Sequence, residues 1–232
     1  MDFPDLTERV AEVRGRIAHA AQRGGHGQEV RLVAVTKTHG PEAIEAAWAA
    51  GVEDVGENKV QEAMRKQDAL AGSQAERGGV RWHLIGHLQS NKAKALSRFA
   101  LFHALDRDAL VAAAQGVGAR DGRSAEVLVQ VNVSGEESKG GFGPAVLPAL
   151  AERLRGMTGM VVRGVMTMAP FDAEERVLRE VFAGARAARA VLRAAGLPAT
   201  ELSMGMSGDY EVAVEEGATL VRLGTVLFGT RG

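Results

Sequence analysis

The chain has 232 residues, of which 46% are hydrophobic and 25% charged, and its formal net charge is −1. This balance is typical of a soluble globular protein and disfavours nucleic acid or an anionic membrane as a partner, because both favour a basic excess. The absence of cysteine excludes disulfides, thiolate nucleophiles and thiolate metal sites. The N-terminus lacks the apolar core of a signal peptide, and no apolar run approaches the roughly 20 residues of a membrane span. We therefore expect a cytoplasmic protein.

Short apolar runs alternate with longer helical patterns along the chain. In chain order we predict a helix over 5–22, a strand over 31–36, a helix over 41–50, a strand over 52–56, a helix over 59–71, a strand over 82–85, a short helix over 91–97, a strand over 99–105, a helix capped by Asp106, a strand over 126–133, a helix over 144–154, a strand over 160–166, a helix over 172–195, a strand over 202–204, a helix over 209–216 and a strand over 219–223. Such alternation predicts a parallel sheet covered by helices. Eight strand–helix units favour an α/β fold, a single (β/α)8 barrel of the TIM type with an extra N-terminal helix, and residues 1–232 are expected to form one domain.

The first strand delivers a lysine to the rim where such barrels carry their active groups. These groups sit at the carboxyl ends of the strands, and Lys37 directly follows the first predicted strand. A solvated lysine at a strand end is the plainer interpretation. The sharper hypothesis is an imine-forming amine, because partial burial lowers a lysine's pKa and makes it a nucleophile for aldehydes such as pyridoxal 5′-phosphate (PLP). Position and chemistry alone leave both alternatives open.

Two small-residue turns after the last two strands predict an anion site. Ser207 lies in a turn that opens a helix, where a hydroxyl and free backbone N–H groups favour an anion. Gly224 and Thr225 end the eighth strand, and the loops after strands 7 and 8 recurrently bind phosphate in these barrels. Each motif alone has a plainer interpretation, a helix N-cap for Ser207 and a turn glycine for Gly224. Their occurrence at adjacent strand ends supports the phosphate alternative.

An arginine interrupts the apolar eighth strand. Arg222 must find a partner or reach solvent, and a pair with a carboxylate such as Glu201 is the simplest expectation. His83 and His87 are four residues apart, but they straddle a strand and a glycine loop and would not share a helix face. No glutamate lies beside His83, so the zinc-helix motif is absent and we expect no metal site.

Motifs spread along the chain match one known family in order and at family-like spacing, from about Arg31 to Gly229. The matching segments are Ala34–Lys37, Gly56–Glu62, Trp82–Gly86, Leu88–Lys92, Val131–Val133, Lys139, Gly164–Met168, Leu202–Ser207 and Val221–Thr225. Together they resemble the YggS/PROSC family of PLP homeostasis proteins. The number of separate motifs makes the resemblance highly specific, and only the first 30 residues are uninformative.

The resemblance implies a PLP-binding barrel like the N-terminal domain of alanine racemase, with the cofactor bound covalently. The implied cofactor-binding residues are Lys37 as the Schiff-base lysine, Ser207, Gly224 and Thr225 on the phosphate, Arg222 facing the pyridine nitrogen, Asn58 approaching the ring, and Met166 packed near it. The family often has other residues at His87 and Gly208, so neither receives a role.

Two functions from different classes follow. A carrier would bind PLP, mask its aldehyde and release it, with PLP-dependent apo-enzymes as the expected recipients; an enzyme would be an amino-acid racemase or decarboxylase. Racemases of this architecture carry a further β domain with a catalytic tyrosine, whereas this sequence ends at Gly232 and its only tyrosine, Tyr210, follows the phosphate turn. These features favour the non-catalytic carrier, expected as a monomer rather than a dimer. A PLP-free barrel enzyme acting on a sugar phosphate is the third alternative.

Overall fold

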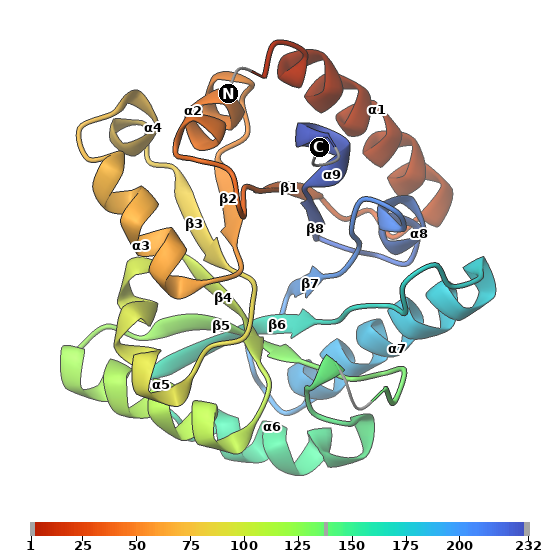
Figure 1. Ribbon diagram of the computed structural model, residues 1–232. Coiled ribbons are helices and arrows are strands. Elements are labelled where there is room, and N and C mark those ends of the chain that lie inside the picture. Colours follow the sequence, from red (N-terminus) through yellow and green to blue (C-terminus); the bar gives the residue numbers. More distant parts are fainter. Residues whose placement is uncertain (1–2, 137–138, 230–232) are drawn as a thin grey trace.

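Eight parallel strands close into a barrel with helices around its outside (Figure 1). The computed structural model describes residues 3–136 and 139–229. Each strand pairs with the next one along the chain, and β8 pairs with β1 to close the ring. The strands are β1 (Arg31–Val35), β2 (Asp54–Glu57), β3 (Arg81–Leu84), β4 (Leu101–Leu105), β5 (Ala125–Gln130), β6 (Met160–Met166), β7 (Glu201–Ser203) and β8 (Leu220–Leu223). The predicted (β/α)8 fold is confirmed.

The helices follow the strands in the order that the sequence predicts. They are α1 (Leu6–Gly24), α2 (Glu42–Ala49), α3 (Val60–Ala69), α4 (Gln74–Arg77), α5 (Asp108–Asp121), α6 (Leu147–Arg155), α7 (Glu175–Ala194), α8 (Tyr210–Glu215) and α9 (Thr225–Phe228), with 3-10 turns at η1 (Ser90–Arg98) and η3 (Pro144–Val146). The predicted short helix after β3 is thus a 3-10 helix. The four-residue helices α4 and α9 were not predicted, because segments this short carry no helical period.

The extra helix α1 lies against the end of the chain. Its apolar residues Leu6, Val10, Val13 and Ile17 recur at helical spacing and are all buried. They pack the helix against α8 and α9, as the neighbouring ribbons in Figure 1 show. Gly25 ends the helix with φ +66°, a left-handed conformation that glycine adopts without steric cost.

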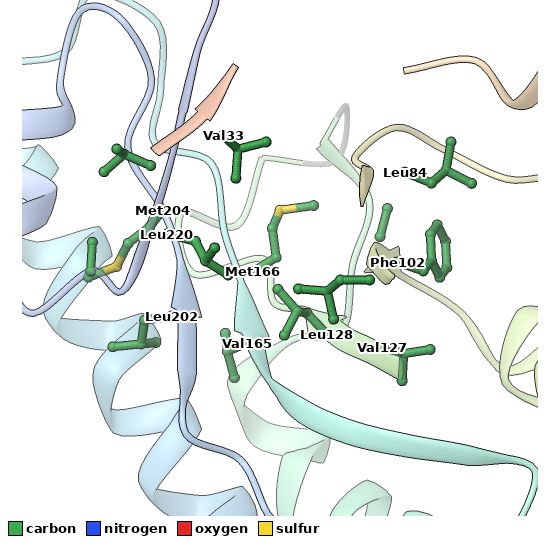
Figure 2. Close-up of a cluster of buried hydrophobic side chains, with 14 of the residues drawn as sticks. Val33, Leu84, Phe102, Val127, Leu128, Val165, Met166, Leu202, Met204 and Leu220 are labelled. Carbon is green, nitrogen blue, oxygen red and sulfur yellow. The ribbon is translucent and has the colours of Figure 1, made fainter. Parts of the chain in front are cut away.

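The barrel strands are buried on both faces, as expected of a parallel sheet covered by helices. Figure 2 shows part of the resulting core. Leu128 comes from β5, Val165 and Met166 come from β6, and Leu202 comes from β7. Because the barrel is densely packed, the sequence and conformation of the loops at the strand ends can vary without disturbing it. The same packing holds those loops at set positions.

Asp106 does not cap a helix, so that prediction is wrong. Helix α5 begins at Asp108, and its N-cap residue is Arg107, whose side chain makes no capping hydrogen bond. The Asp106 carboxylate is instead occupied by two side chains, His87 Nδ1 at 2.7 Å and Arg107 Nη1 at 2.6 Å. Hydrogen bonds to these side chains are stronger than a capping bond to a backbone amide, so the carboxylate does not cap the helix.

Within residues 3–136 and 139–229, no helix combines the length and the apolar character that crossing a membrane requires.

Candidate functional site

A large cavity opens where the strands end. It measures about 970 Å³ and is lined by residues at or just after the ends of all eight strands, together with the adjoining loops. Six of the seven predicted cofactor-binding residues line it, namely Lys37, Asn58, Ser207, Arg222, Gly224 and Thr225. The seventh, Met166, is 1% exposed within the core and is not among the lining residues; Met168 lines the cavity instead.

A second cavity of about 480 Å³ lies at the opposite end of the barrel, where the strands begin. Its arginines are already neutralised by carboxylates: Arg31 pairs with Glu201 at 2.8 Å and Arg163 with Glu126 at 2.6 Å. No lysine lines this cavity among the described residues. The larger cavity, which is lined by Lys37 and Lys139 and by small-residue loops, is therefore the candidate site.

Lys37 stands at the end of β1 on a turn whose backbone is firmly held. Its side chain is exposed and lines the cavity, so the partial burial that the nucleophile hypothesis invoked is not observed. The next residue, Thr38, has φ +68°, which is rare for a β-branched residue and costs conformational energy. The Thr38 amide donates to Glu62 Oε1 at 2.6 Å, and the His39 amide donates to the Thr36 carbonyl at 3.1 Å.

A buried ion pair lies behind this turn. Lys66 Nζ contacts Glu57 Oε1 at 2.7 Å and Glu62 Oε1 at 2.9 Å, and it donates to the Thr36 carbonyl at 2.9 Å. The Thr36 hydroxyl donates to Glu57 Oε1 at 2.6 Å. These contacts tie the residues on either side of Lys37 to β2 and α3. The lysine backbone is thereby fixed, while its own side chain projects from the rim.

The loops after β7 and β8 meet at Ser207. The Val226 amide donates to Ser207 Oγ at 3.3 Å, which leaves the hydroxyl hydrogen available for another acceptor. Within the described part of the chain, the amides of Ser207, Gly208 and Thr225 have no hydrogen-bond partner. Hydroxyl and amide donors that converge in this way suit a phosphate.

The plain N-cap interpretation of Ser207 is not observed. Helix α8 begins at Tyr210 with Asp209 as its N-cap residue. The Asp209 carboxylate accepts the Met206 amide at 2.6 Å and so shapes the turn that carries Ser207. Burial raises the pKa of Asp209, although the Met206 amide and the charge of Arg222 oppose that rise.

Arg222 is 5% exposed and lines the cavity from β8. The expected pair with Glu201 is absent, because Glu201 lies at the start of β7 and binds Arg31. Arg222 Nη1 donates to Ser203 Oγ at 2.6 Å and Nη2 donates to the Thr167 carbonyl at 3.1 Å. Burial lowers the pKa of Arg222 to about 10, so the guanidinium stays charged at neutral pH.

The opposite rim carries groups that sequence reasoning missed. Asp106 lines the cavity and binds His87, and Gln130 lines it at the end of β5, where its Nε2 donates to the Lys139 carbonyl at 2.6 Å. The exposed ring of Phe171 follows β6 and also lines the cavity. The position of Asp106 and Gln130 at the ends of β4 and β5 was the available signal, because strand ends define the rim.

The two histidines considered as metal ligands lie in different surroundings. His83 is 1% exposed inside the barrel, and His87 is exposed on the loop after β3. Within residues 3–136 and 139–229, no group of three histidine, aspartate or glutamate residues is arranged to hold a metal ion.

A lysine just after β1 and the hydrogen-bond donors after β7 and β8 line one cavity, and this barrel belongs to the alanine racemase N-terminal domain class. The family model described as "Alanine racemase, N-terminal domain" matches residues 10–232. Proteins of Aquifex aeolicus and Pseudomonas aeruginosa, both named "Pyridoxal phosphate homeostasis protein", are each 40% identical to this chain, over 97% of it and over 97% and 96% of their own lengths. The chain belongs to the family of pyridoxal phosphate homeostasis proteins, which confirms the resemblance seen in the sequence.

Solved structures agree with this assignment. PipY of Synechococcus elongatus, solved with PLP bound, has a TM-score of 0.84 and 37% identity to this chain, covering 97% of this chain and 100% of PipY. Alanine racemase of Corynebacterium glutamicum has a TM-score of 0.70 at 20% identity, covering 94% of this chain and 61% of the racemase. The racemase is therefore similar to this chain in fold alone, whereas PipY is similar to it in both fold and sequence.

Proposed function

We propose that this protein binds PLP in the cavity at the strand ends and serves in PLP homeostasis, as a carrier or buffer of the cofactor. The observation that carries the proposal is that Lys37, Ser207 and Arg222, which lie far apart in the sequence, line one cavity. The printed names of the relatives and the PLP bound to PipY support the same ligand. PLP-dependent apo-enzymes are the proposed recipients.

The cavity residues fit the chemistry of this cofactor. PLP supplies an aldehyde that condenses with an amine, and it carries an anionic phosphate. We assign Lys37 to the covalent Schiff base, because it is the lysine just after β1 and its turn is held by hydrogen bonds to Glu62 and Lys66. The remaining proposed contacts are Ser207, Gly224 and Thr225 to the phosphate, Arg222 to the pyridine nitrogen, and Asn58 beside the ring. Met166 does not line the cavity, so it would support the cofactor site only by packing behind the residues that do.

Arg222 also bears on the type of chemistry. An arginine keeps its proton at neutral pH, so beside the pyridine nitrogen it would act as a donor and leave that nitrogen unprotonated. A neutral pyridine is a poorer electron sink than a pyridinium. This arrangement favours holding the cofactor over strong stabilisation of a carbanion.

The single tyrosine of the chain argues for the carrier over a racemase. Tyr210 is 2% exposed on α8 and does not line the cavity, so its hydroxyl is out of reach as an acid or base. His87 and Asp106 do line the cavity, and their presence makes a direct activity test necessary. We further propose a single PLP-binding domain that acts as a monomer; a cytoplasmic location stays a prediction from the sequence.

The attachment point is tested by borohydride reduction of PLP-loaded protein followed by peptide mass spectrometry. We expect PLP mass on the Lys37 peptide and its loss in Lys37→Ala, which should lose the covalent bond and keep only the proposed phosphate contacts. Lys59→Ala is the matched control, because Lys59 is exposed and lies outside the lining residues. Label on Lys59 or Lys92 in the wild type would show that the assignment to Lys37 is wrong.

The carrier function is tested by turnover. PLP-loaded protein incubated with each amino acid should give no multiple-turnover racemisation in chiral analysis, yet should reconstitute an apo-enzyme when mixed with it. Racemisation that depends on Lys37 would establish the enzyme instead. A protein that takes up no PLP from an excess would leave the PLP-free sugar-phosphate enzyme as the better alternative.

A further inference from the structure

A file of hydrogen-bonded polar side chains runs through the inside of the barrel. Arg222 Nη1 contacts Ser203 Oγ at 2.6 Å, and Ser203 Oγ contacts His103 Nδ1 at 2.8 Å. His103 Nε2 contacts His83 Nδ1 at 2.8 Å, and His83 Nε2 contacts Asp54 Oδ1 at 2.8 Å. Each of the five residues is at most 5% exposed.

The file crosses the barrel from one end to the other. His103 belongs to β4 and Ser203 to β7, and because these strands are not neighbours in the ring, their side chains meet only through the interior. Arg222 lines the candidate cofactor cavity, whereas His83 lines the smaller cavity at the opposite end. There Arg81 binds both carboxylate oxygens of Asp54, at 2.8 and 2.7 Å.

The chemistry of the two ends sets the direction of every hydrogen bond. A guanidinium can only donate, so Ser203 Oγ accepts from Arg222, and an ionised carboxylate can only accept, so Asp54 accepts from His83 Nε2. With both rings neutral, His83 Nδ1 accepts from His103 Nε2, and His103 Nδ1 accepts from the Ser203 hydroxyl. Both histidines are then protonated at Nε2 only. The reverse order would require a doubly protonated His83 in the core.

The direction of these hydrogen bonds helps to stabilise the buried charge of Arg222. Arg222 is buried, yet among the described residues it forms no ion pair at contact distance, and Asp209 acts on it only at longer range. A buried charge without a counter-charge is costly, and aligned hydrogen bonds strengthen one another in a low-dielectric interior. The file is oriented with its carboxylate at the far end, as stabilisation of a cation at the near end requires.

We propose that Ser203, His103 and His83 are positioning residues for Arg222, holding the guanidinium in one orientation toward the cofactor through hydrogen bonds that all point away from it toward Asp54. The inference rests on the proposed function, because Arg222 acts there on the pyridine nitrogen. Loosening the file should let Arg222 turn away and let that nitrogen gain a proton. The histidines themselves do not touch the ligand.

The first test concerns the file alone and uses PLP-free protein. Nitrogen-15 NMR of the imidazoles at pH 7, with the two rings assigned by His83→Gln and His103→Gln, should show both protonated at Nε2 and bare at Nδ1. Ser203→Ala should shift the Nδ1 resonance of His103, because it loses its donor. An imidazolium, or a proton on Nδ1 of either ring, would overturn the proposed direction of the file.

The second test measures the effect on the cofactor. Ser203→Ala removes a hydrogen bond to the charged guanidinium and should weaken PLP retention about tenfold. His103→Leu removes only the neutral acceptor of the Ser203 hydroxyl and should weaken PLP retention about fivefold. In both variants the nitrogen-15 resonance of ring-labelled PLP should move toward the protonated form. His103→Gln, which can both donate and accept, should stay within about threefold of the wild type.

Thr219→Val is the matched control for removing a hydroxyl. Thr219 lies next to β8, and its hydroxyl accepts the Leu202 amide at 2.8 Å and donates to Glu201, outside the file. It should leave both the PLP affinity and the ring-nitrogen resonance unchanged. If the nitrogen-15 resonance of the PLP ring does not shift in Ser203→Ala and His103→Leu, the file has only a structural role and the proposal is wrong. Failure of the wild type to bind PLP would instead contradict the proposed function. The NMR of PLP-free protein would still show whether the hydrogen bonds of the file run in the proposed direction.

Discussion

Lys66 Nζ lies 2.7 Å from Glu57 Oε1 in an ion pair that is almost completely buried beneath Thr36, the residue before Lys37. Removing one partner of such a pair leaves an uncompensated charge in the core. Lys66→Met should therefore lower the free energy of unfolding by about 3–5 kcal/mol in urea titration. Lys94→Met, at an exposed lysine, should change it by less than about 0.5 kcal/mol. Adding Glu57→Gln to Lys66→Met should restore part of the loss, and no recovery would contradict the charge argument.

Ser207→Ala should weaken PLP binding without unfolding the protein. The hydroxyl hydrogen of Ser207 is the one available to a phosphate oxygen, since its oxygen already accepts the Val226 amide. Loss of one hydrogen bond to a charged group predicts about 1.5–3 kcal/mol in binding free energy, measured by equilibrium dialysis. Ser124→Ala is the control, because the Ser124 hydroxyl donates to the Thr158 carbonyl outside the cavity. Equal affinity in the two variants would remove Ser207 from the phosphate site.

Stability in acid should depend on Asp54. Burial alone would raise the pKa of this carboxyl, but hydrogen bonds from Arg81 and His83 outweigh burial and hold its pKa well below its usual range. A carboxylate of depressed pKa stabilises the fold above its unfolded pKa of roughly 3.9, and the contribution is lost as the pH falls toward the folded value.

Asp54→Asn should accordingly lower the free energy of unfolding at pH 7 by about 2–3 kcal/mol, less than for a fully buried pair because Arg81 is 42% exposed. The difference between variant and wild type should shrink below about pH 4. Asp68→Asn, at an exposed carboxylate paired with Arg98, should cost less than about 1 kcal/mol. Urea titrations at pH 7, 4 and 3 make the comparison, and a constant difference across them would disprove the linkage.

Tyr210→Phe should be neutral or stabilising. The Tyr210 hydroxyl is buried and has no hydrogen-bond partner within the described part of the chain. Removing an unsatisfied buried polar group relieves a desolvation penalty of about 1–3 kcal/mol. Thermal unfolding of the two proteins measures the change. A loss of more than about 1 kcal/mol would mean that the hydroxyl has a partner such as bound water.

Strand ends were the part of the site that could be predicted from the sequence. Lys37 was found because apolar runs locate strands and because barrels present their active groups where strands finish, whereas Arg222 was assigned to the cofactor only through the family resemblance. Ser207 and Thr225 followed from small-residue turns at two adjacent strand ends. All four line the same cavity in the folded chain.

Contacts across the barrel could not be predicted in this way. Ser203 and His103 are 100 residues apart, and their hydrogen bond depends on which strands face each other across the interior. Glu201 was the partner suggested for Arg222, but it lies at the opposite end of the barrel and binds Arg31. The role of Asp106 was misjudged because a local capping preference was weaker than the side-chain partners His87 and Arg107.

The bond from the Val226 amide to Ser207 couples two loops that would otherwise move separately. When the Ser207 hydroxyl donates to an anion, its oxygen becomes a better acceptor, so the Val226 bond tightens in turn. Occupancy of the cavity should thus stiffen the whole rim on that side. Slower deuterium uptake at Val226 on loading would record the cofactor's arrival at an amide that need not touch it.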